Sequence, residues 1–253
     1  MKRSSGVRAA ATVVVSAVTL ALVTGCGGDS TGSDAKALSA AELKKAIIAQ
    51  GDVEGYKVDA SGKRLPSENE VKSTDDKCRP LAHAMGGLAP GDSPVSKAAV
   101  IATQEKKKPT DKPSKSLDEM SPDEIEDSLS NAMSLDMTIV GLSSYDGDGA
   151  EETFKSVSDA VKNCSGGFPF VMQGEDQKPS EVKPEKASGA GDESVAFVVK
   201  SDMDGDVGTS HVEVVRHGAT IATYYTMNLG LMMTDKAYDV PAAIIDAQTA
   251  KLK

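Results

Sequence analysis

The spacing of hydrophobic and polar residues near the end of the chain predicts a group of neighbouring β-strands. The ranges 194–200, 211–216 and 219–227 are rich in Val, Ile, Tyr and Thr, which favour strands. The first range is apolar at odd and even positions alike, so we expect both of its faces to be buried. Only His217 and Gly218 separate the other two, which predicts a tight hairpin.

Shorter apolar runs earlier in the chain predict the remaining strands. The range 56–58 suits a first strand, and the run at 97–104 has an antiparallel partner at 137–144. The range 168–172 predicts an edge strand, because its proline has no N–H to donate to a ladder. The polar range 63–76 predicts a loop.

Helix signals occur at both ends and in the middle of the chain. A capping box at 39–42 predicts a first short helix. The range 148–163 has an apolar stripe and acidic residues in its first turn, which favour a helix. Further helices are expected around Cys78, over 122–132 at the surface, and after 239–241. Together these elements predict an α+β fold, in which helices pack on a twisted antiparallel sheet.

The N-terminus has the three parts of a secretion signal: basic residues, an apolar range at 9–22, and small residues before Cys26. The apolar range is shorter than the roughly 20 residues that a spanning helix needs. The sequence VTGC at 23–26 resembles a bacterial lipobox, whose cysteine receives a diacylglyceryl group and becomes the new N-terminus. We therefore expect a signal peptide at 1–25 and a lipid on Cys26 that holds the protein on the outer face of the cell membrane. An ordinary signal with a chance cysteine and an uncleaved anchor are the alternatives.

The residues after the lipobox predict a tether and then one domain. The range 26–38 consists mainly of Gly, Ser, Asp, Thr and Ala, which cannot bury apolar surface, so we expect a flexible segment. The range 39–253 is expected to form a single domain. Within it, the lysines, prolines and acidic residues of 105–133 predict a solvated surface insertion, with a patch for lipid headgroups as the alternative.

The acidic charge argues against one class of partner. The chain has a formal net charge of −10, and loss of the leader, which carries three basic and no acidic residues, would change it to −13. Binding to a phosphate backbone needs clustered Lys and Arg, so we expect no nucleic-acid partner. Aromatic residues make up 4% of the chain and tryptophan is absent, which disfavours stacking platforms for bases or sugars.

Two cysteines, Cys78 and Cys164, follow the lipobox. Outside the cytoplasm, an even number of cysteines most simply forms disulfides. A redox or metal-binding pair is the alternative, but the two residues lack the Cys-x-x-Cys spacing typical of such sites. We therefore expect a disulfide with Cα atoms about 4.4 to 6.8 Å apart.

Catalytic motifs do not match the chain. The range 141–145 (GLSSY) fails the Gly-x-Ser-x-Gly pattern at its last position, and no His-Glu-x-x-His or phosphate-binding loop occurs. His83, His211 and His217 fall in an expected helix, strand and turn, where ordinary polar roles are common. We expect no catalytic residues and no cofactor.

One acidic stretch imitates the spacing of a calcium loop. Its members are Asp202, Asp204, Asp206 and Glu213, but Val207 stands where the loop requires glycine, and strands flank it in place of helices. We interpret the stretch as an acidic hairpin loop and expect no metal.

One face of the last predicted strand is the best candidate for binding. Ile221, Thr223, Tyr225 and Met227 lie on one side, because strand side chains alternate. Thr223, Tyr225 and Met227 combine apolar bulk with hydroxyl groups, which can bury and orient a ligand. The alternative is that this face packs under the helices. Tyr224 should point to the opposite face.

Four short motifs suggest a family. They are 78–82 (CRPLA), a helix over 154–164 that ends in cysteine, 191–194 (GDES) opening a strand, and 239–242 (DVPA). In this order they resemble actinobacterial sensor-domain lipoproteins, to which the extracellular sensor domain of a mycobacterial receptor Ser/Thr kinase is related. The resemblance covers about 40–250 and implies an α+β domain, with a twisted antiparallel sheet and a cleft for an unidentified ligand. This chain differs in having one cysteine pair where two are expected, and no functional residues can be carried over.

Two classes of function fit the sequence. The first is a non-catalytic ligand-binding or sensing module outside the membrane, for a small molecule or lipid. The second is an envelope module that docks on another protein without holding a small molecule. A hydrolase is a third, weaker alternative. A concave apolar surface would favour the first class, and a flat apolar patch the second.

Overall fold

The computed structural model describes residues 36–106, 120–122, 124–125, 128, 133–203, 205–232, 234 and 236–253. The expected signal peptide, Cys26 and most of the tether lie outside the described residues, as does most of the surface helix expected at 122–132. Among the described residues, no helix is long and apolar enough to cross a membrane.

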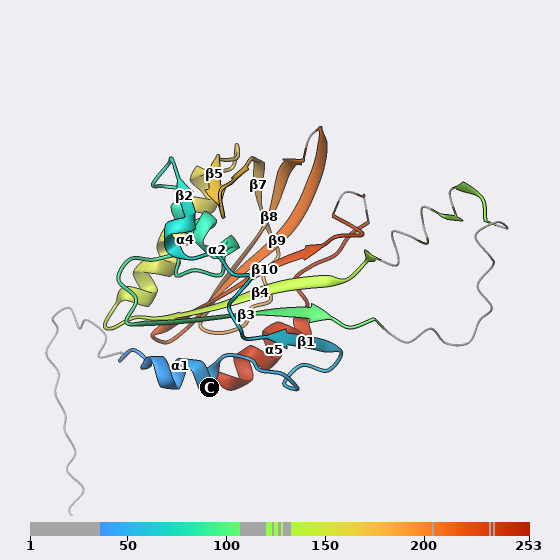
Figure 1. Ribbon diagram of the computed structural model, residues 1–253. Coiled ribbons are helices and arrows are strands. Elements are labelled where there is room, and N and C mark those ends of the chain that lie inside the picture. The colour runs from blue at the N-terminus through green and yellow to red at the C-terminus, as the bar shows by residue number, and fades with distance from the viewer. Residues whose placement is uncertain are drawn as a thin grey trace, which may run out of the picture. The chain divides into compact units, whose positions relative to one another are not determined.

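A seven-stranded antiparallel sheet forms the middle of the folded domain (Figure 1). The strands lie in the order β1-β3-β4-β10-β9-β8-β7. Their bounds are β1 (Tyr56–Asp59), β3 (Ser96–Gln104), β4 (Asp136–Ser144), β7 (Pro179–Glu185), β8 (Glu193–Met203), β9 (Asp206–His217) and β10 (Thr220–Asn228).

Helices cover both faces of this sheet (Figure 1). On one side, which we call the α2 face, lie α2 (Arg79–Met85) and α4 (Gly149–Asn163). On the other, the α5 face, lie α1 (Ala40–Ala46) and α5 (Ala242–Lys251). Each face has its own apolar core, so the predicted α+β fold with helices on an antiparallel sheet is confirmed.

The first helix begins as the capping box predicts. Ser39 Oγ accepts a hydrogen bond from Glu42 N, and Glu42 Oε2 accepts one from Ser39 N at 2.9 Å. The attachment to the domain starts earlier than residue 39, however. Ala37 N donates to Asp146 Oδ1 at 3.0 Å, and Leu38 N donates to Ser144 Oγ at 2.9 Å. Two residues assigned to the tether are therefore docked on the domain, because their backbone N–H groups find acceptors there.

The disulfide joins the two helices of the α2 face. Cys78 immediately precedes α2 and Cys164 follows α4, with Cα atoms 5.9 Å apart, so the expected bond is confirmed. Both residues are buried, among Phe154, Val157 and other residues of the same core cluster.

A small three-stranded sheet corrects two of the predictions. The range 63–76, expected to be a loop, contains the 3₁₀ turn η1 (Glu68–Glu70) and β2 (Val71–Ser73). The expected edge strand is β5 (Phe170–Met172), and it lies between β2 and β6 (Glu175–Gln177). Pro169 stands just before β5, so its missing N–H is no obstacle to pairing on both sides.

The edge of the large sheet also contains a strand, β7, that the sequence pattern did not predict. β7 pairs with β8 and carries Pro179 and Pro184, which an edge strand tolerates. β8 lies between β7 and β9, which confirms its predicted interior position. The β9–β10 hairpin is also confirmed, with Gly218 at φ +55° in its turn.

Candidate functional site

The row of side chains chosen from the sequence lies on the α2 face of β10. Ile221 and Tyr225 belong to the core cluster that includes α2 and α4, whereas Ala222 and Tyr224 belong to the cluster beneath the other face. Tyr224 and Tyr225 thus point to opposite faces, as the strand period predicts.

The neighbouring strands extend this row across the sheet. On β4, Gly141, Ile139 and Met137 stand opposite Thr223, Tyr225 and Met227. Ladder partners share a face, so the row gains two apolar side chains and one position without a side chain. On β9, Val212 stands opposite Tyr225 and Val214 opposite Thr223.

One end of the row is closed by the end of α2. Gly87 has φ +67°, and a Cβ atom there would lie 2.4 Å from Ile139 Cγ2. A Cβ atom at Gly141 would lie 2.6 Å from the Gly87 carbonyl oxygen. Only glycine at these two positions lets α2 end directly against the sheet. Thr223 is consequently 1% exposed, and its hydroxyl has no hydrogen-bond partner among the described residues.

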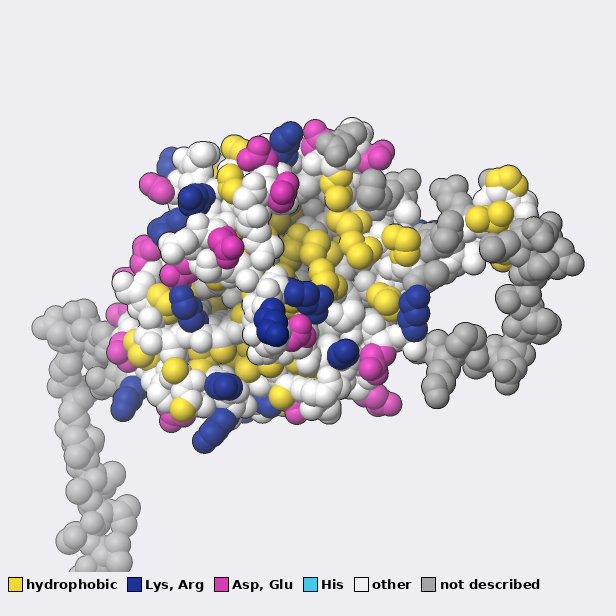
Figure 2. All heavy atoms as spheres, viewed as in Figure 1, with side chains coloured by type: hydrophobic (Ala, Val, Ile, Leu, Met, Phe, Trp, Pro, Cys, Tyr) yellow, Lys and Arg dark blue, Asp and Glu magenta, His cyan; other side chains and the backbone are white. Residues whose placement is uncertain are grey.

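The other end of the row remains open. Tyr225, Met227 and Met137 are half-buried, unlike Ile221, which is fully buried. Figure 2 shows hydrophobic side chains gathered on this side of the molecule, over β4, β10 and β9 and beside α2. The row therefore runs from a closed end to an accessible apolar end.

Tyr225 provides the polar group of the open end. Burial raises the pKa of its phenol, and a hydrogen bond with the Ser210 side chain acts in the opposite direction. The phenol therefore stays protonated near neutral pH, so that it can donate a hydrogen bond as well as accept one.

The structure thus separates the three predicted ligand-binding residues. Tyr225 and Met227 lie together at the open end, and Thr223 lies at the closed end under Gly87. Binding by these residues stays a prediction. A ligand at the open end can meet Tyr225 and Met227 directly, whereas Thr223 is reached only if the end of α2 moves.

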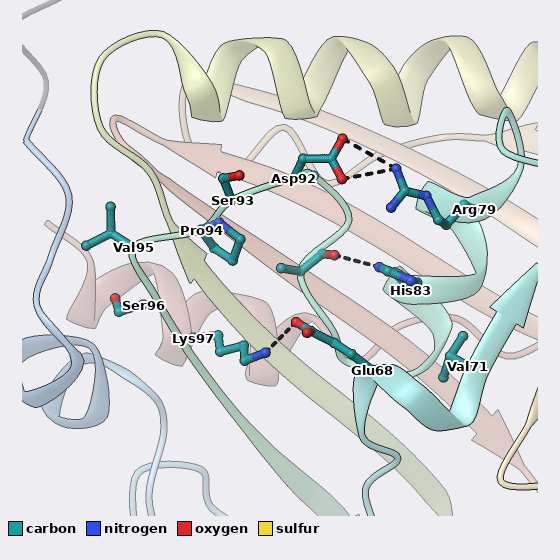
Figure 3. Close-up of a pocket in the computed structure, with 12 residues that line it drawn as sticks. Glu68, Val71, Arg79, His83, Asp92, Ser93, Pro94, Val95, Ser96 and Lys97 are labelled. Carbon is teal, nitrogen blue, oxygen red and sulfur yellow. Dashed lines mark hydrogen bonds and ion pairs between the residues drawn. The ribbon is translucent and has the colours of Figure 1, made fainter.

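A second candidate site is a hollow of about 570 Å³ bounded by η1, α2 and the start of β3 (Figure 3). Arg79 Nη2 lies 3.0 Å from Asp92 Oδ1, and Lys97 Nζ contacts Glu68 Oε1. The hydrogen bond from Lys97 holds the pKa of the Glu68 carboxyl below its usual value. These four residues neutralise one another in two pairs, so they offer a charged ligand no unmatched charge.

The three histidines occupy different surroundings. His83 Nδ1 lies 2.9 Å from the Ala89 carbonyl oxygen, and His211 Nδ1 lies 3.1 Å from the Glu185 carboxylate. His217 is half-buried at the β9–β10 turn, where desolvation lowers its pKa. They do not form a common site.

The acidic stretch with calcium-loop spacing is divided between a turn and a strand. Asp202 pairs with Val207 near the β8–β9 turn, whereas Glu213 pairs with Ala196 further along the ladder, roughly 20 Å away at 3.3 Å per residue. Glu213 is 4% exposed and accepts a hydrogen bond from Ser188 N at 3.0 Å. It cannot share a cation with the turn.

Met137, which completes the open end, was not predicted as a site residue. It was assigned to a strand, but no local signal places that strand beside β10. A joint search for apolar rows of matching length on distant strands could have suggested the pairing.

Comparison with known proteins finds a similar solved structure and no matching family. No family model matches the chain, and no curated protein matches it. Among solved structures, the extracellular domain of PknH from Mycobacterium tuberculosis is similar, with a TM-score of 0.48 and 8% sequence identity. The match covers 86% of this chain and 96% of that chain. The chain is thus similar to an extracellular domain of the kind that its motifs indicated.

Proposed function

We propose that this protein is a cell-envelope lipoprotein whose domain binds a ligand outside the membrane without catalysing a reaction. In this proposal, residues 1–25 are removed, Cys26 carries the lipid anchor, and the single domain with its insertion near 105–133 is the binding module. The lipobox-like sequence at 23–26 supports the anchor. The Cys78–Cys164 bond supports an oxidising compartment, because disulfides persist there.

The observation that carries the binding role is the half-open apolar row on β10 and β4. Tyr225, Met227 and Met137 leave part of their apolar surface accessible, next to a phenol that can donate a hydrogen bond. An accessible apolar surface with a few polar groups is typical of small-molecule sites. Methionine side chains adapt their shape, which suits a flexible occupant.

The chemistry of the row favours an uncharged or lipid-like molecule with an apolar body and one hydrogen-bonding group. None of Thr223, Tyr225, Met227 and their partners on β4 carries a charge. A charged ligand would lose its hydration there without a counter-charge. The unpartnered Thr223 hydroxyl at the closed end could pair with a second polar group of a longer molecule.

Mass spectrometry of the full chain purified from its own host tests both parts of the proposal. Denaturing conditions should show a mass that corresponds to cleavage before Cys26 and addition of acyl chains. Native conditions should show an additional bound molecule that is lost from Tyr225→Phe, because its hydroxyl anchors the polar group. The melting temperature of this variant should change little.

Tyr224→Phe is the matched control, because Tyr224 lies next in sequence but on the opposite face. It should retain the bound molecule. If both variants retain it, or if its loss in Tyr225→Phe accompanies a loss of stability, the β10 row is core and not a binding site.

Docking of an envelope protein on the same row is the second candidate. Leu229 is 58% exposed and Met133 is 55% exposed, and both lie just beyond the open ends of β10 and β4. These apolar residues would extend the surface for a protein partner. A native mass without any small molecule, together with a captured protein that Tyr225→Phe and Leu229→Ser both release, would favour this alternative.

A further inference from the structure

The α5 face of the sheet carries a group of potential metal ligands that no sequence motif predicted. Glu185 ends β7, His211 lies in β9, and Asp239 lies in the segment just before α5. One ligand atom from each of them lies within 4.8 Å of the other two. We propose that these three residues bind a divalent transition-metal ion, such as Zn²⁺.

The sheet register explains how Glu185 and His211 meet. Glu185 pairs with Ala196 on β8, and Ala196 pairs with Glu213 on β9. His211 is two residues from Glu213 and therefore shares its face. His211 itself pairs with Val198 on β8, so Glu185 approaches it diagonally across this strand. His211 Nδ1 lies 3.1 Å from both carboxylate oxygens of Glu185.

Contacts with β9 hold the third ligand in place. The Tyr238 ring packs edge-on against His211, with centroids 4.6 Å apart, and its hydroxyl donates to the Thr209 carbonyl oxygen. Asp239 follows directly and is exposed, so an ion can enter from solvent. Among the described residues, the Asp239 carboxylate has no ion-pair partner. A purely structural pair of Glu185 and His211 would not need this second carboxylate.

The geometry and chemistry suit a transition metal better than calcium or magnesium. Zinc binds nitrogen and carboxylate oxygen at about 2.0 to 2.2 Å, so tetrahedral ligands lie roughly 3.4 Å apart. The His211–Glu185 spacing of 3.1 Å is already close to this value, and the ligand atom of the exposed Asp239 lies within 4.8 Å of both. An imidazole ligand disfavours Ca²⁺ and Mg²⁺, which prefer oxygen.

The local charge also favours a cation. His211 is 8% exposed, and the ring is held between Glu185 and Tyr238. A divalent ion would neutralise the two carboxylates of the cluster. It would also bind the segment before α5 to β7 and β9, and leave a fourth position for water or a partner's donor group.

Calorimetric titration of the full chain with Zn²⁺, after removal of metals by chelation and dialysis, tests the proposal. We expect one zinc ion per chain at this site and a higher melting temperature with zinc. Asp239→Asn should weaken the binding by at least about tenfold, and His211→Gln should abolish it. Ca²⁺ in excess should not displace zinc.

Asp206→Asn is the matched control, because it removes an exposed carboxylate from the β8–β9 turn instead of the cluster. It should bind zinc as the unchanged protein does. Since Asp239 is exposed, its variant stays informative even if His211→Gln fails to fold. Absence of zinc binding at micromolar concentration overturns the proposal. Zinc binding that Asp239→Asn leaves unchanged also overturns it, because the ion is then held elsewhere, for example by a free Cys26 thiol.

Discussion

The two ends of the β10 row differ in what lies on them, although one strand carries both. At the closed end, Ile221 and Thr223 are covered by α2, whose final turn rests on the sheet through Gly87. At the open end, Tyr225 and Met227 have the same alternation and similar apolar character but are only half-buried. The contrast teaches that periodicity assigns a side chain to a face, whereas the end of a neighbouring helix decides whether that face is core or accessible surface.

The largest expected effect concerns the Cys78–Cys164 disulfide, which links α2 to α4 over the closed end of the row. Replacing Cys78 and Cys164 together by alanine removes a link between residues 86 positions apart. The chain-entropy model gives a loss of about 4 to 5 kcal/mol, as an upper figure. Urea unfolding of the variant, compared with the disulfide-bonded unchanged protein, measures the loss. A loss below about 1 kcal/mol would mean that α2 and α4 hold their places through packing alone.

A pair of truncations compares the two ends directly. Ile221→Ala removes a fully buried side chain and should cost about 2 to 5 kcal/mol. Met227→Ala removes a half-buried one and should cost about 1 kcal/mol or less. Equal losses in thermal or urea unfolding would show that the open end is as well packed as the closed end.

A smaller effect is expected where α2 meets the sheet. Gly141→Ala places a Cβ atom 2.6 Å from the Gly87 carbonyl oxygen, a backbone atom that cannot rotate away. Overpacking of this kind costs about 1 to 3 kcal/mol. Gly166→Ala is the control, since a Cβ atom there meets nothing within 4 Å. If both variants melt at the same temperature, α2 is not seated as tightly as the glycine contacts indicate.

Local signals predicted those parts of the fold that depend on nearby residues. The Ser39 cap, the α4 stripe and the Gly218 hairpin turn each rely on residues a few positions apart, and all three are confirmed. The Cys78–Cys164 pairing was also predictable, because only two cysteines remained after the lipobox. The fold class followed from these elements.

Long-range pairing was the part that the sequence could not reveal. β2 consists of Val71, Lys72 and Ser73, which show no strand period, and it becomes a strand only because β5 supplies its partner. The open end depends in the same way on β4 lying beside β10. The proposed zinc ligands come from three separate elements, so no spacing along the chain could have identified them.

The position of β10 beside β4 also has a consequence for how the chain folds. Ser144 and Thr220, whose hydroxyl oxygens lie 3.0 Å apart, are separated by 76 positions. The β3–β4 hairpin can form early, but the second edge of β4 must wait until nearly the whole chain has been made. Such non-local pairing slows folding and leaves a strand edge open to pairing with other chains. The interval before β10 pairs with β4 is therefore when this protein is most prone to aggregate.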